Sequence, residues 1–119
     1  MRLREIVTLI NGKVLTGHEH IDNEVQSAFG SDLMSDVLAY VHDDTLLITG
    51  LINHQVIRTA EMLDLRAILF VRGKEPSEDV IELAKGHPIT LMCTDHSLFT
   101  TAGILYNNGV KGVSLNDER

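Results

Sequence analysis

Several residue types are scarce in this sequence, and each shortage excludes a class of protein. Among 119 residues there is one cysteine, Cys93, which excludes an intrachain disulfide and a cysteine-built zinc site. Ten lysines and arginines stand against 17 aspartates and glutamates, and the resulting net charge of −7 disfavours binding to nucleic acid or to an anionic membrane surface. No apolar run reaches the length of a membrane span, and the N-terminus lacks the apolar stretch of a signal peptide. We therefore expect a cytoplasmic protein with reduced thiols, in which Cys93 is a small buried side chain.

The common phosphate-binding and catalytic motifs are also missing. The sequence contains neither the P-loop pattern GxxxxGK followed by Ser or Thr, nor the dinucleotide-binding pattern GxGxxG. It has no HExxH zinc motif and no GxSxG nucleophile elbow. His18 and His20 are spaced to share a strand face, but no third ligand stands at a fixed distance from them. We expect no metal centre, no cofactor and no catalytic constellation.

A stretch near the middle of the chain has the pattern of a strand, a helix and a second strand. The apolar runs Leu46–Ile48 and Ala67–Val71 do not alternate with polar residues, as is typical of strands buried on both faces. Four apolar residues between them recur at the spacing of one helical face: Val56, Ile57, Ala60 and Leu63. Such a βαβ unit brings both strand ends to one edge of a parallel sheet, where ligands bind in open α/β folds.

Strands and helices alternate on both sides of this unit. We predict further strands at residues 24–29 and 89–93, an edge strand within 110–115, and helices at residues 33–41, 76–85 and 98–107. A helix at 3–10 and a strand at 13–17 form a short N-terminal addition, and residues 116–119 form a tail. The pattern predicts an α/β fold: a mostly parallel, Rossmann-like sheet between two layers of helices. We expect a single domain over residues 1–119, with a core from about residue 24 to residue 109.

The turns that follow the parallel strands should lie side by side at the carboxyl edge of the sheet. Helix N-terminal N–H groups and Arg72 favour a phosphate-bearing anion at that edge, whereas Asp32 and Asp95 oppose it. The turn at Gly30–Asp32 joins the edge if its strand is parallel as well. The candidate ligand-binding residues are Ser31, Asp32, Thr49, Gly50, Asn53, His54, Arg72, Gly73, Ser77, Thr94, Asp95 and Ser97.

Each of these side chains also has an explanation that involves no ligand. Asn53, Ser77 and Ser97 stand where helices begin, and these residue types are common N-caps. Arg72 ends a buried strand, and its guanidinium either binds phosphate or carboxylate or forms a salt bridge with an acidic residue between positions 75 and 79. The residues alone leave both interpretations of Arg72 open.

The stretch from residue 46 to residue 102 resembles the DRTGG domain family. Its segments match the family pattern in order: Ile48-Thr49-Gly50 at the first strand end, Asn53-His54 where the family has Asp-Arg, Val71-Arg72-Gly73 where it has Thr-Gly-Gly, Pro76, and Thr94–Ala102 as the closing element. The segment Gly30–Met34 looks like the stand-alone members. Both halves of the name motif are altered, and Gly73 is the residue that clearly remains.

The resemblance implies a scaffold more than a site. It implies a fold like that of the N-terminal domain of HPr kinase/phosphorylase and of the middle domain of long phosphate acetyltransferases. In CBS-domain pyrophosphatases the family's domain is regulatory and associates in pairs, so the resemblance implies a sensing or scaffold role. The missing P-loop argues against kinase activity.

We therefore expect a non-catalytic regulatory module that senses an anionic metabolite or nucleotide at the carboxyl edge of the sheet. It should act through a homodimer or a partner enzyme, because several helical residues are apolar beyond one face: Met62, Leu65, Ile104 and Tyr106. Two alternatives remain open at this point. One is a small enzyme acting on a phosphorylated or acyl substrate, and the other is an assembly domain without a ligand.

Overall fold

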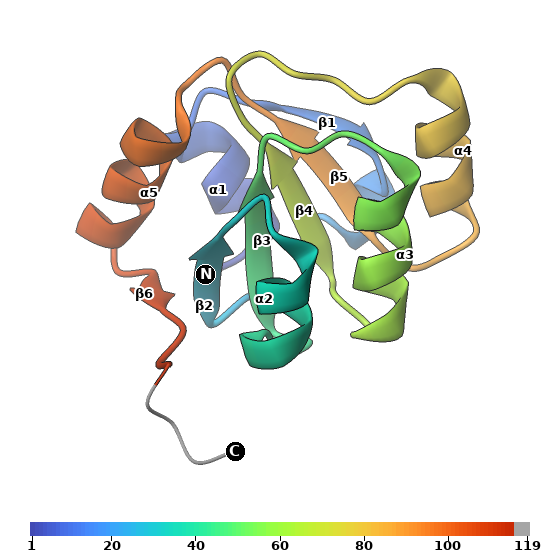
Figure 1. Cartoon of the computed structure of the whole chain (residues 1–119). Helices are drawn as coiled ribbons and strands as arrows, with labels where there is room; N and C mark the ends of the chain where they lie inside the picture. The colour runs from blue at the N-terminus through green and yellow to red at the C-terminus, as the bar shows by residue number, and fades with distance from the viewer. Residues whose placement is uncertain (116–119) are drawn as a thin grey trace.

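A six-stranded sheet in the order β1-β5-β4-β3-β2-β6 forms the middle layer of the computed structural model, which describes residues 1–115 (Figure 1). The strands are β1 (Lys13–Thr16), β2 (Ser27–Gly30), β3 (Thr45–Thr49), β4 (Ala67–Phe70), β5 (Thr90–Cys93) and β6 (Lys111–Gly112). β2 to β5 are parallel, β6 is parallel to β2, and β1 is antiparallel to β5. The predicted mostly parallel α/β fold is confirmed. The tail expected at residues 116–119 lies outside the described residues.

Helices cover both faces of this sheet. The α-helices are α1 (Leu3–Leu9), α2 (Met34–Tyr40), α3 (His54–Met62), α4 (Glu78–Lys85) and α5 (Leu98–Asn107), and η1 (His18–His20) is a short 3₁₀ turn. α2, α3 and α4 pack on one face, and α1 and α5 pack on the other. Successive side chains of β3 point to opposite layers: Leu47 packs with α2 and α3, whereas Leu46 and Ile48 pack with α1 and α5. The apolar run at this strand is continuous because both faces are covered.

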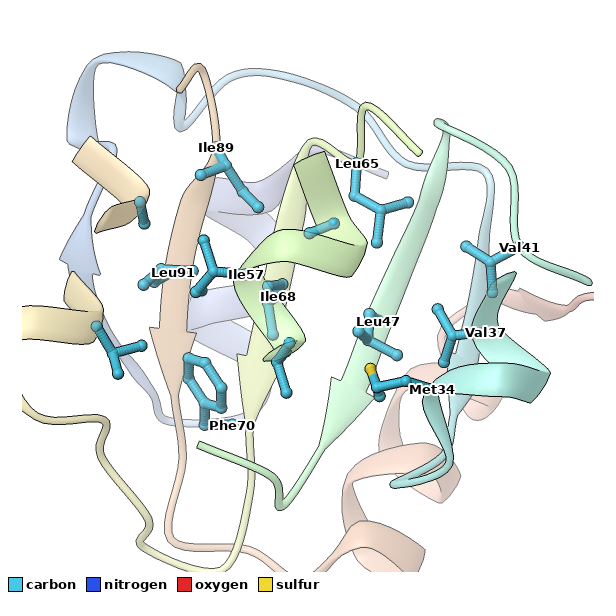
Figure 2. Packing of buried hydrophobic residues seen from close by; sticks show 14 of the residues in the cluster. Met34, Val37, Val41, Leu47, Ile57, Leu65, Ile68, Phe70, Ile89 and Leu91 are labelled. Atoms are coloured by element: carbon cyan, nitrogen blue, oxygen red, sulfur yellow. The ribbon is translucent and has the colours of Figure 1, made fainter. Parts of the chain in front are cut away.

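The core on the α2–α3–α4 side is assembled from all three helices and three strands, as Figure 2 shows. Ile57 from α3 lies over Ile68 of β4 and Leu91 of β5. Leu65, which we expected to be surplus surface, is only 3% exposed and belongs to this core. That part of the homodimer argument is therefore wrong, because Leu65 follows the left-handed Asp64 at the end of α3 and turns back under the helix.

The N-terminal helix and strand are built into the sheet and its second layer. Leu3, Ile6 and Ile10 are fully buried with β3, β4 and α5 residues. Two buried threonine hydroxyls of the β5 segment donate to this unit: Thr90 Oγ1 to the Gly17 carbonyl (2.9 Å) and Thr94 Oγ1 to the Ile10 carbonyl (2.8 Å). The unit is thus more than an addition, since it supplies an edge strand and half of one helical layer.

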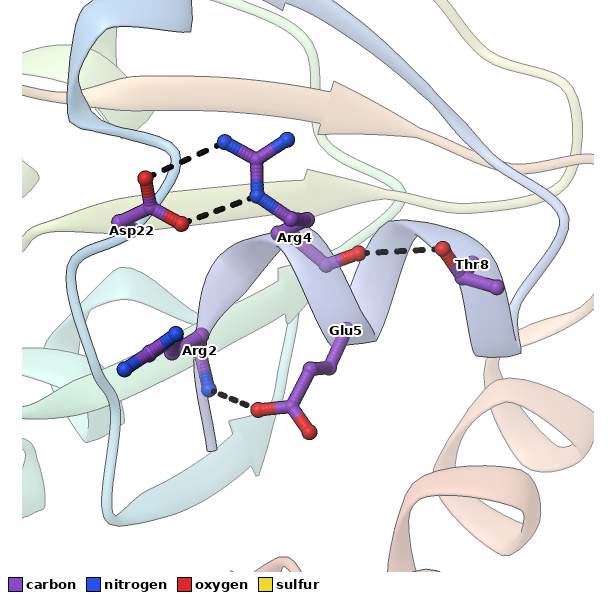
Figure 3. A network of polar contacts seen from close by, with 5 residues as sticks. All are labelled: Arg2, Arg4, Glu5, Thr8 and Asp22. Atoms are coloured by element: carbon purple, nitrogen blue, oxygen red, sulfur yellow. Dashed lines mark hydrogen bonds and ion pairs between the residues drawn. The ribbon is translucent and has the colours of Figure 1, made fainter.

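Figure 3 shows the polar contacts on the exposed side of α1. Arg4 donates from Nε and Nη2 to the two carboxylate oxygens of Asp22, at 2.9 and 3.2 Å. The backbone N–H of Arg2 donates to Glu5 Oε1 (3.0 Å), and Thr8 Oγ1 donates to the Arg4 carbonyl (3.3 Å). The ion pair is largely exposed, so it orients α1 more than it stabilises the fold.

The inward face of α5 differs from the expected one. The apolar spacing of the sequence predicts that Leu98, Phe99, Ala102 and Leu105 point inward. In the structure Phe99 and Ala102 are exposed, and the buried positions are Thr101 and Leu105, with Leu98 half-buried. The helix itself was predicted correctly, but its buried side was not. α5 has no charged residue to mark the side that faces solvent, so the hydrophobic pattern does not identify the buried side. α4 also begins later than expected, with Ser77 as its N-cap residue, so Pro76 precedes the helix.

Candidate functional site

All four turns that follow the parallel strands meet at one edge of the sheet. The strand registers pair Gly30 with Ile48, Thr49 with Phe70, and Phe70 with Cys93. The strands therefore end at the same level, and the turns after β2, β3, β4 and β5 lie next to one another along the edge (Figure 1). The turn at Gly30–Asp32 does join the other three, because β2 is parallel to β3.

The chain leaves β4 and β5 toward opposite faces of the sheet. α4 packs in the layer with α2 and α3, whereas α5 packs in the layer with α1. Two neighbouring parallel strands whose helices diverge form a topological switch point, the usual position of ligands in open α/β sheets. Here the two turns are joined by main-chain hydrogen bonds: Arg72 N–H donates to the His96 carbonyl (2.8 Å), and Gly73 N–H donates to the Thr94 carbonyl (3.0 Å).

Arg72 is placed at this edge in a backbone conformation that favours glycine. Its φ is 64° and that of Gly73 is 68°, so both residues are left-handed. The guanidinium lies across the β3–α3 turn, where a β-carbon on Gly50 would stand 2.3 Å from Arg72 Nη2. Arg72 is exposed, and within residues 1–115 its guanidinium forms no ion pair. The expected alternative, a salt bridge to an acidic residue at positions 75–79, is therefore absent from this part of the chain.

Asp32 fills the position of an anion at the β3–α3 turn. Its Oδ1 accepts hydrogen bonds from Thr49 Oγ1 (2.8 Å) and from the backbone N–H of Gly50 (2.9 Å). These two bonds, with the positive charge of Arg72, lower the pKa of Asp32 even though partial burial opposes the shift. The donors that we expected to receive an external anion at this turn are thus used by the chain's own carboxylate.

Three other candidate side chains are used within the fold. Asn53 Oδ1 accepts from Val56 N–H (3.3 Å) and Ser97 Oγ accepts from Thr100 N–H (3.2 Å), so both are N-caps as the alternative interpretation predicts. The backbone N–H of Leu33 donates to Ser31 Oγ (3.0 Å), which orders the start of the α2 loop.

His54 and Ser77 both contact Asp79 at the start of α4. His54 Nε2 lies 3.0 Å from Asp79 Oδ2, and Ser77 Oγ donates to Asp79 Oδ1. A nucleophilic hydroxyl needs the imidazole as its direct neighbour, with the carboxylate behind the imidazole. Here the carboxylate lies between them, so this arrangement joins α3 to α4 and does not activate Ser77.

A hollow of about 190 Å³ lies on the β5 side of the edge. Of its lining residues, Gly73, Thr94 and Asp95 were candidates, and the other five were not. These five come from the turn before β1 and its first residue, from the β4–α4 turn and from the end of β5: Asn11, Gly12, Lys13, Glu75 and Cys93. The antiparallel register of Lys13 with Cys93 brings the first group there, and no local sequence signal marks that pairing. Lys13 Nζ is paired with Glu75 Oε2 at 3.0 Å.

Two further properties bear on the type of site. No cluster of three or more histidine, cysteine, aspartate or glutamate side chains within residues 1–115 is arranged to hold a metal ion. In the same part of the chain, every helix is too short or too polar to cross a membrane.

The fold and its edge define a Rossmann-like α/β module with a topological switch point between β4 and β5. The chain belongs to the DRTGG domain family, whose model matches residues 5–107. Positions 72 and 73, which the sequence comparison aligned with the Gly-Gly of the name motif, both have a left-handed backbone, the conformation that favours glycine. This chain has glycine at position 73 and arginine at position 72. No curated protein matches the sequence.

A solved structure has the same fold. It comprises the CBS and DRTGG domains of the regulatory region of Clostridium perfringens pyrophosphatase, complexed with the activator diadenosine tetraphosphate. The TM-score is 0.71 at 18% sequence identity, and the match covers 87% of this chain and 45% of that one. At this identity the likeness establishes the fold, and this chain spans less than half of that structure.

Proposed function

We propose that this chain is a non-catalytic regulatory module that binds an anionic metabolite or nucleotide at the carboxyl edge of its sheet. The observation that supports the proposal most is the guanidinium of Arg72, which forms no ion pair within residues 1–115 and lies over Gly50 at the edge where ligands of α/β sheets bind. The left-handed backbone of Arg72 is strained, and a residue with no role beyond the surface would not need that conformation. Such strain concentrates at functional sites. Guanidinium groups bind phosphate and carboxylate through paired hydrogen bonds.

The bound anion would sit against Arg72 beside Asp32. Asp32 already holds Thr49 Oγ1 and Gly50 N–H, so an anion that used these donors would have to replace it. The negative charge of Asp32 competes with the bound anion, and this competition favours multiply charged ligands over singly charged ones. The candidates Gly73, Thr94 and Asp95 line the neighbouring hollow, which is wide enough for an uncharged part of the same ligand.

The proposal of a sensing role follows from family membership and from what surrounds the site. A DRTGG domain stands in the regulatory region of a pyrophosphatase that was solved with a nucleotide activator. Around the present edge, Ser77 lacks an imidazole partner and Asn53 and Ser97 are helix caps, so the hydroxyls and amides have structural partners. The signal would pass to a second copy of the chain or to a partner enzyme.

Isothermal titration with diadenosine tetraphosphate, ATP, AMP and inorganic phosphate tests the site. For any ligand that binds, Arg72→Ala should weaken binding roughly ten- to a hundredfold, since a charge-assisted pair contributes about 1.5–3 kcal/mol. Arg58→Ala is the matched control, because Arg58 is an exposed cation on α3 away from the edge, and its removal should leave affinity unchanged. Asp32→Asn should strengthen binding several-fold by removing the competing charge.

Two results would contradict the proposal. If all four probes fail to bind at millimolar concentration, the edge is not a site for phosphate-bearing ligands. If Arg72→Ala and Arg58→Ala weaken binding equally, the effect comes from net charge and the ligand lies elsewhere.

A further inference from the structure

The outward face of α5 is apolar and has no covering element in the described chain. Phe99 is 87% exposed and Tyr106 is 71% exposed. Ala102 and Gly103, also exposed, lie between them at the i+3 and i+4 positions. These four residues share one helical stripe. We refer to Phe99, Ala102, Gly103 and Tyr106 as the α5 stripe.

The α5 stripe lies on a helix without charge. The sequence of α5, LFTTAGILYN, contains no aspartate, glutamate, lysine or arginine, although the whole chain carries a net charge of −7. The exposed face of α4, by contrast, carries Glu78, Asp79 and Glu82. Two copies of a strongly acidic chain repel each other unless they meet through a neutral surface. α5 provides such a surface.

Nothing within residues 1–115 of one copy requires a glycine at position 103. Its position is the middle of a helix, where glycine costs roughly 0.5–1 kcal/mol relative to alanine. A β-carbon at position 103 would have no atom from elsewhere in the described chain within 4 Å, so the fold of one copy has room for a side chain there. A glycine at an exposed mid-helix position is expected where another backbone approaches closely.

The stripe is complementary to itself under a twofold rotation. Ala102 and Gly103 stand midway between the two aromatic residues, which are seven positions apart. When two α5 helices cross in opposite directions at these small residues, Phe99 of each copy faces Tyr106 of the other. An open hollow of about 100 Å³, lined in part by Ala102, Tyr106 and Gly112, lies beside the position that the second Phe99 approaches.

We infer that the α5 stripe is the contact surface for a second copy of this chain, with the twofold axis at Ala102 and Gly103. The inference rests on the homodimer part of the proposed function and is independent of the ligand. Fully buried aromatic side chains contribute about 150–250 Å² each, so two from each copy bury up to roughly 600–1,000 Å². That area is below the range of stable complexes, roughly 1,200–2,000 Å², and it indicates a weak, concentration-dependent dimer.

Sedimentation equilibrium from about 10 μM to 1 mM, the range for weak association, tests this surface with three variants. Ala102→Glu places two like charges at the axis, and Gly103→Leu blocks the close approach without adding charge. Leu38→Glu is the matched control, because Leu38 is 43% exposed on α2 and the substitution adds the same charge at an exposed apolar position. Thermal unfolding confirms that each variant is folded, as the open space at Gly103 predicts.

We expect both α5 variants to weaken dimerisation at least tenfold and Leu38→Glu to leave it unchanged. A wild-type dimer that is unaffected by the α5 variants would overturn this surface and leave the proposed homodimer in place. Equal weakening by Ala102→Glu and Leu38→Glu, without an effect of Gly103→Leu, would also overturn it, since net charge would then be the cause. A wild-type monomer up to 1 mM would overturn the surface and the homodimer together, without bearing on the anion site.

Discussion

The guanidinium of Arg72 lies against the backbone of Gly50, close enough that a β-carbon on Gly50 would stand 2.3 Å from Nη2 and 3.0 Å from Cζ. The contact joins the turn after β4 to the turn after β3. Because the obstructing atoms belong to the far end of a flexible side chain, a larger residue at position 50 would displace Arg72 and leave the main chain in place.

Gly50→Ala should therefore separate the anion site from the fold. We expect the free energy of unfolding to change by less than about 1 kcal/mol, while affinity for any anion that needs Arg72 falls several-fold. Gly86→Ala is the control, since the nearest atom to a β-carbon there is 3.9 Å away. Titration and urea unfolding of both variants provide the measurement. Wild-type affinity in Gly50→Ala would show that the position of the Arg72 guanidinium against residue 50 does not matter for binding.

The left-handed backbone at position 72 predicts an unusual order of stability. Arg72→Ala keeps a side chain in a conformation that costs roughly 1–2 kcal/mol, whereas Arg72→Gly relieves that cost. The glycine variant should therefore be more stable than the alanine variant by about 1 kcal/mol, after the entropy that glycine gains in the unfolded chain. Urea unfolding with unchanged m-values measures the difference. An alanine variant as stable as the glycine variant would mean that the left-handed conformation is relaxed in solution.

Asp32 predicts a pH-dependent contribution to stability. Hydrogen bonds from Thr49 and Gly50 lower the pKa of Asp32 in the folded state below the ordinary value of about 3.9. The stabilisation is therefore complete above pH ~4 and is lost as the pH falls through the lower folded-state pKa. Asp32→Asn should reduce the free energy of unfolding at pH 7, and the difference from wild type should shrink toward pH 3.

Urea unfolding between pH 7 and pH 3 measures that difference. The exposed loop residue Asp43 supplies the comparison, since Asp43→Asn removes the same charge without touching the β3–α3 turn. A constant difference between wild type and Asp32→Asn across this range would contradict the prediction.

The hydroxyl of Thr94 should hold the N-terminal unit to the sheet. Thr94→Val removes the buried donor to the Ile10 carbonyl, which leaves that carbonyl without this partner at nearly unchanged volume. We expect a loss of about 1–3 kcal/mol in the free energy of unfolding. Thr100→Val, at an exposed position on α5, should cost much less. Chemical denaturation of the two variants decides the matter, and similar small losses in both would mean that water replaces the lost donor.

The sheet was predictable because its central strands are covered on both sides. Leu46–Ile48 and Ala67–Val71 read as continuous apolar runs, and such runs indicate buried parallel strands. The strand expected at 24–29 is β2 at Ser27–Gly30 in the structure, since Val25 is buried outside the ladder, where its N–H donates to the Met1 carbonyl. Burial alone does not mark where a ladder begins.

The sequence predicts that the turns meet at the carboxyl edge of the sheet, but it does not predict the contacts among the residues of those turns. Asp32 and Thr49, 17 residues apart, meet because β2 pairs with β3, and sequence spacing carries no trace of that register. The left-handed conformation of Arg72 has no local signal either, apart from the glycine that the family motif places there. Phe99 was predicted on the wrong side of α5 because the helix has no charged residues, and the sequence therefore does not show which side is exposed.

The antiparallel pairing of β1 with β5 has a consequence for how the chain folds during synthesis. Lys13 pairs with Cys93, so β1 has no partner until a segment about 80 residues later has been synthesised. At about 5–20 residues per second, this delay lasts roughly 4–16 s. The apolar stripe of Leu3, Ile6 and Ile10 packs against β3 and β4, which are made earlier, and also against Met92 of β5 and Leu105 of α5. The N-terminal helix and β1 therefore acquire their full set of native neighbours only after β5 and α5 have been synthesised.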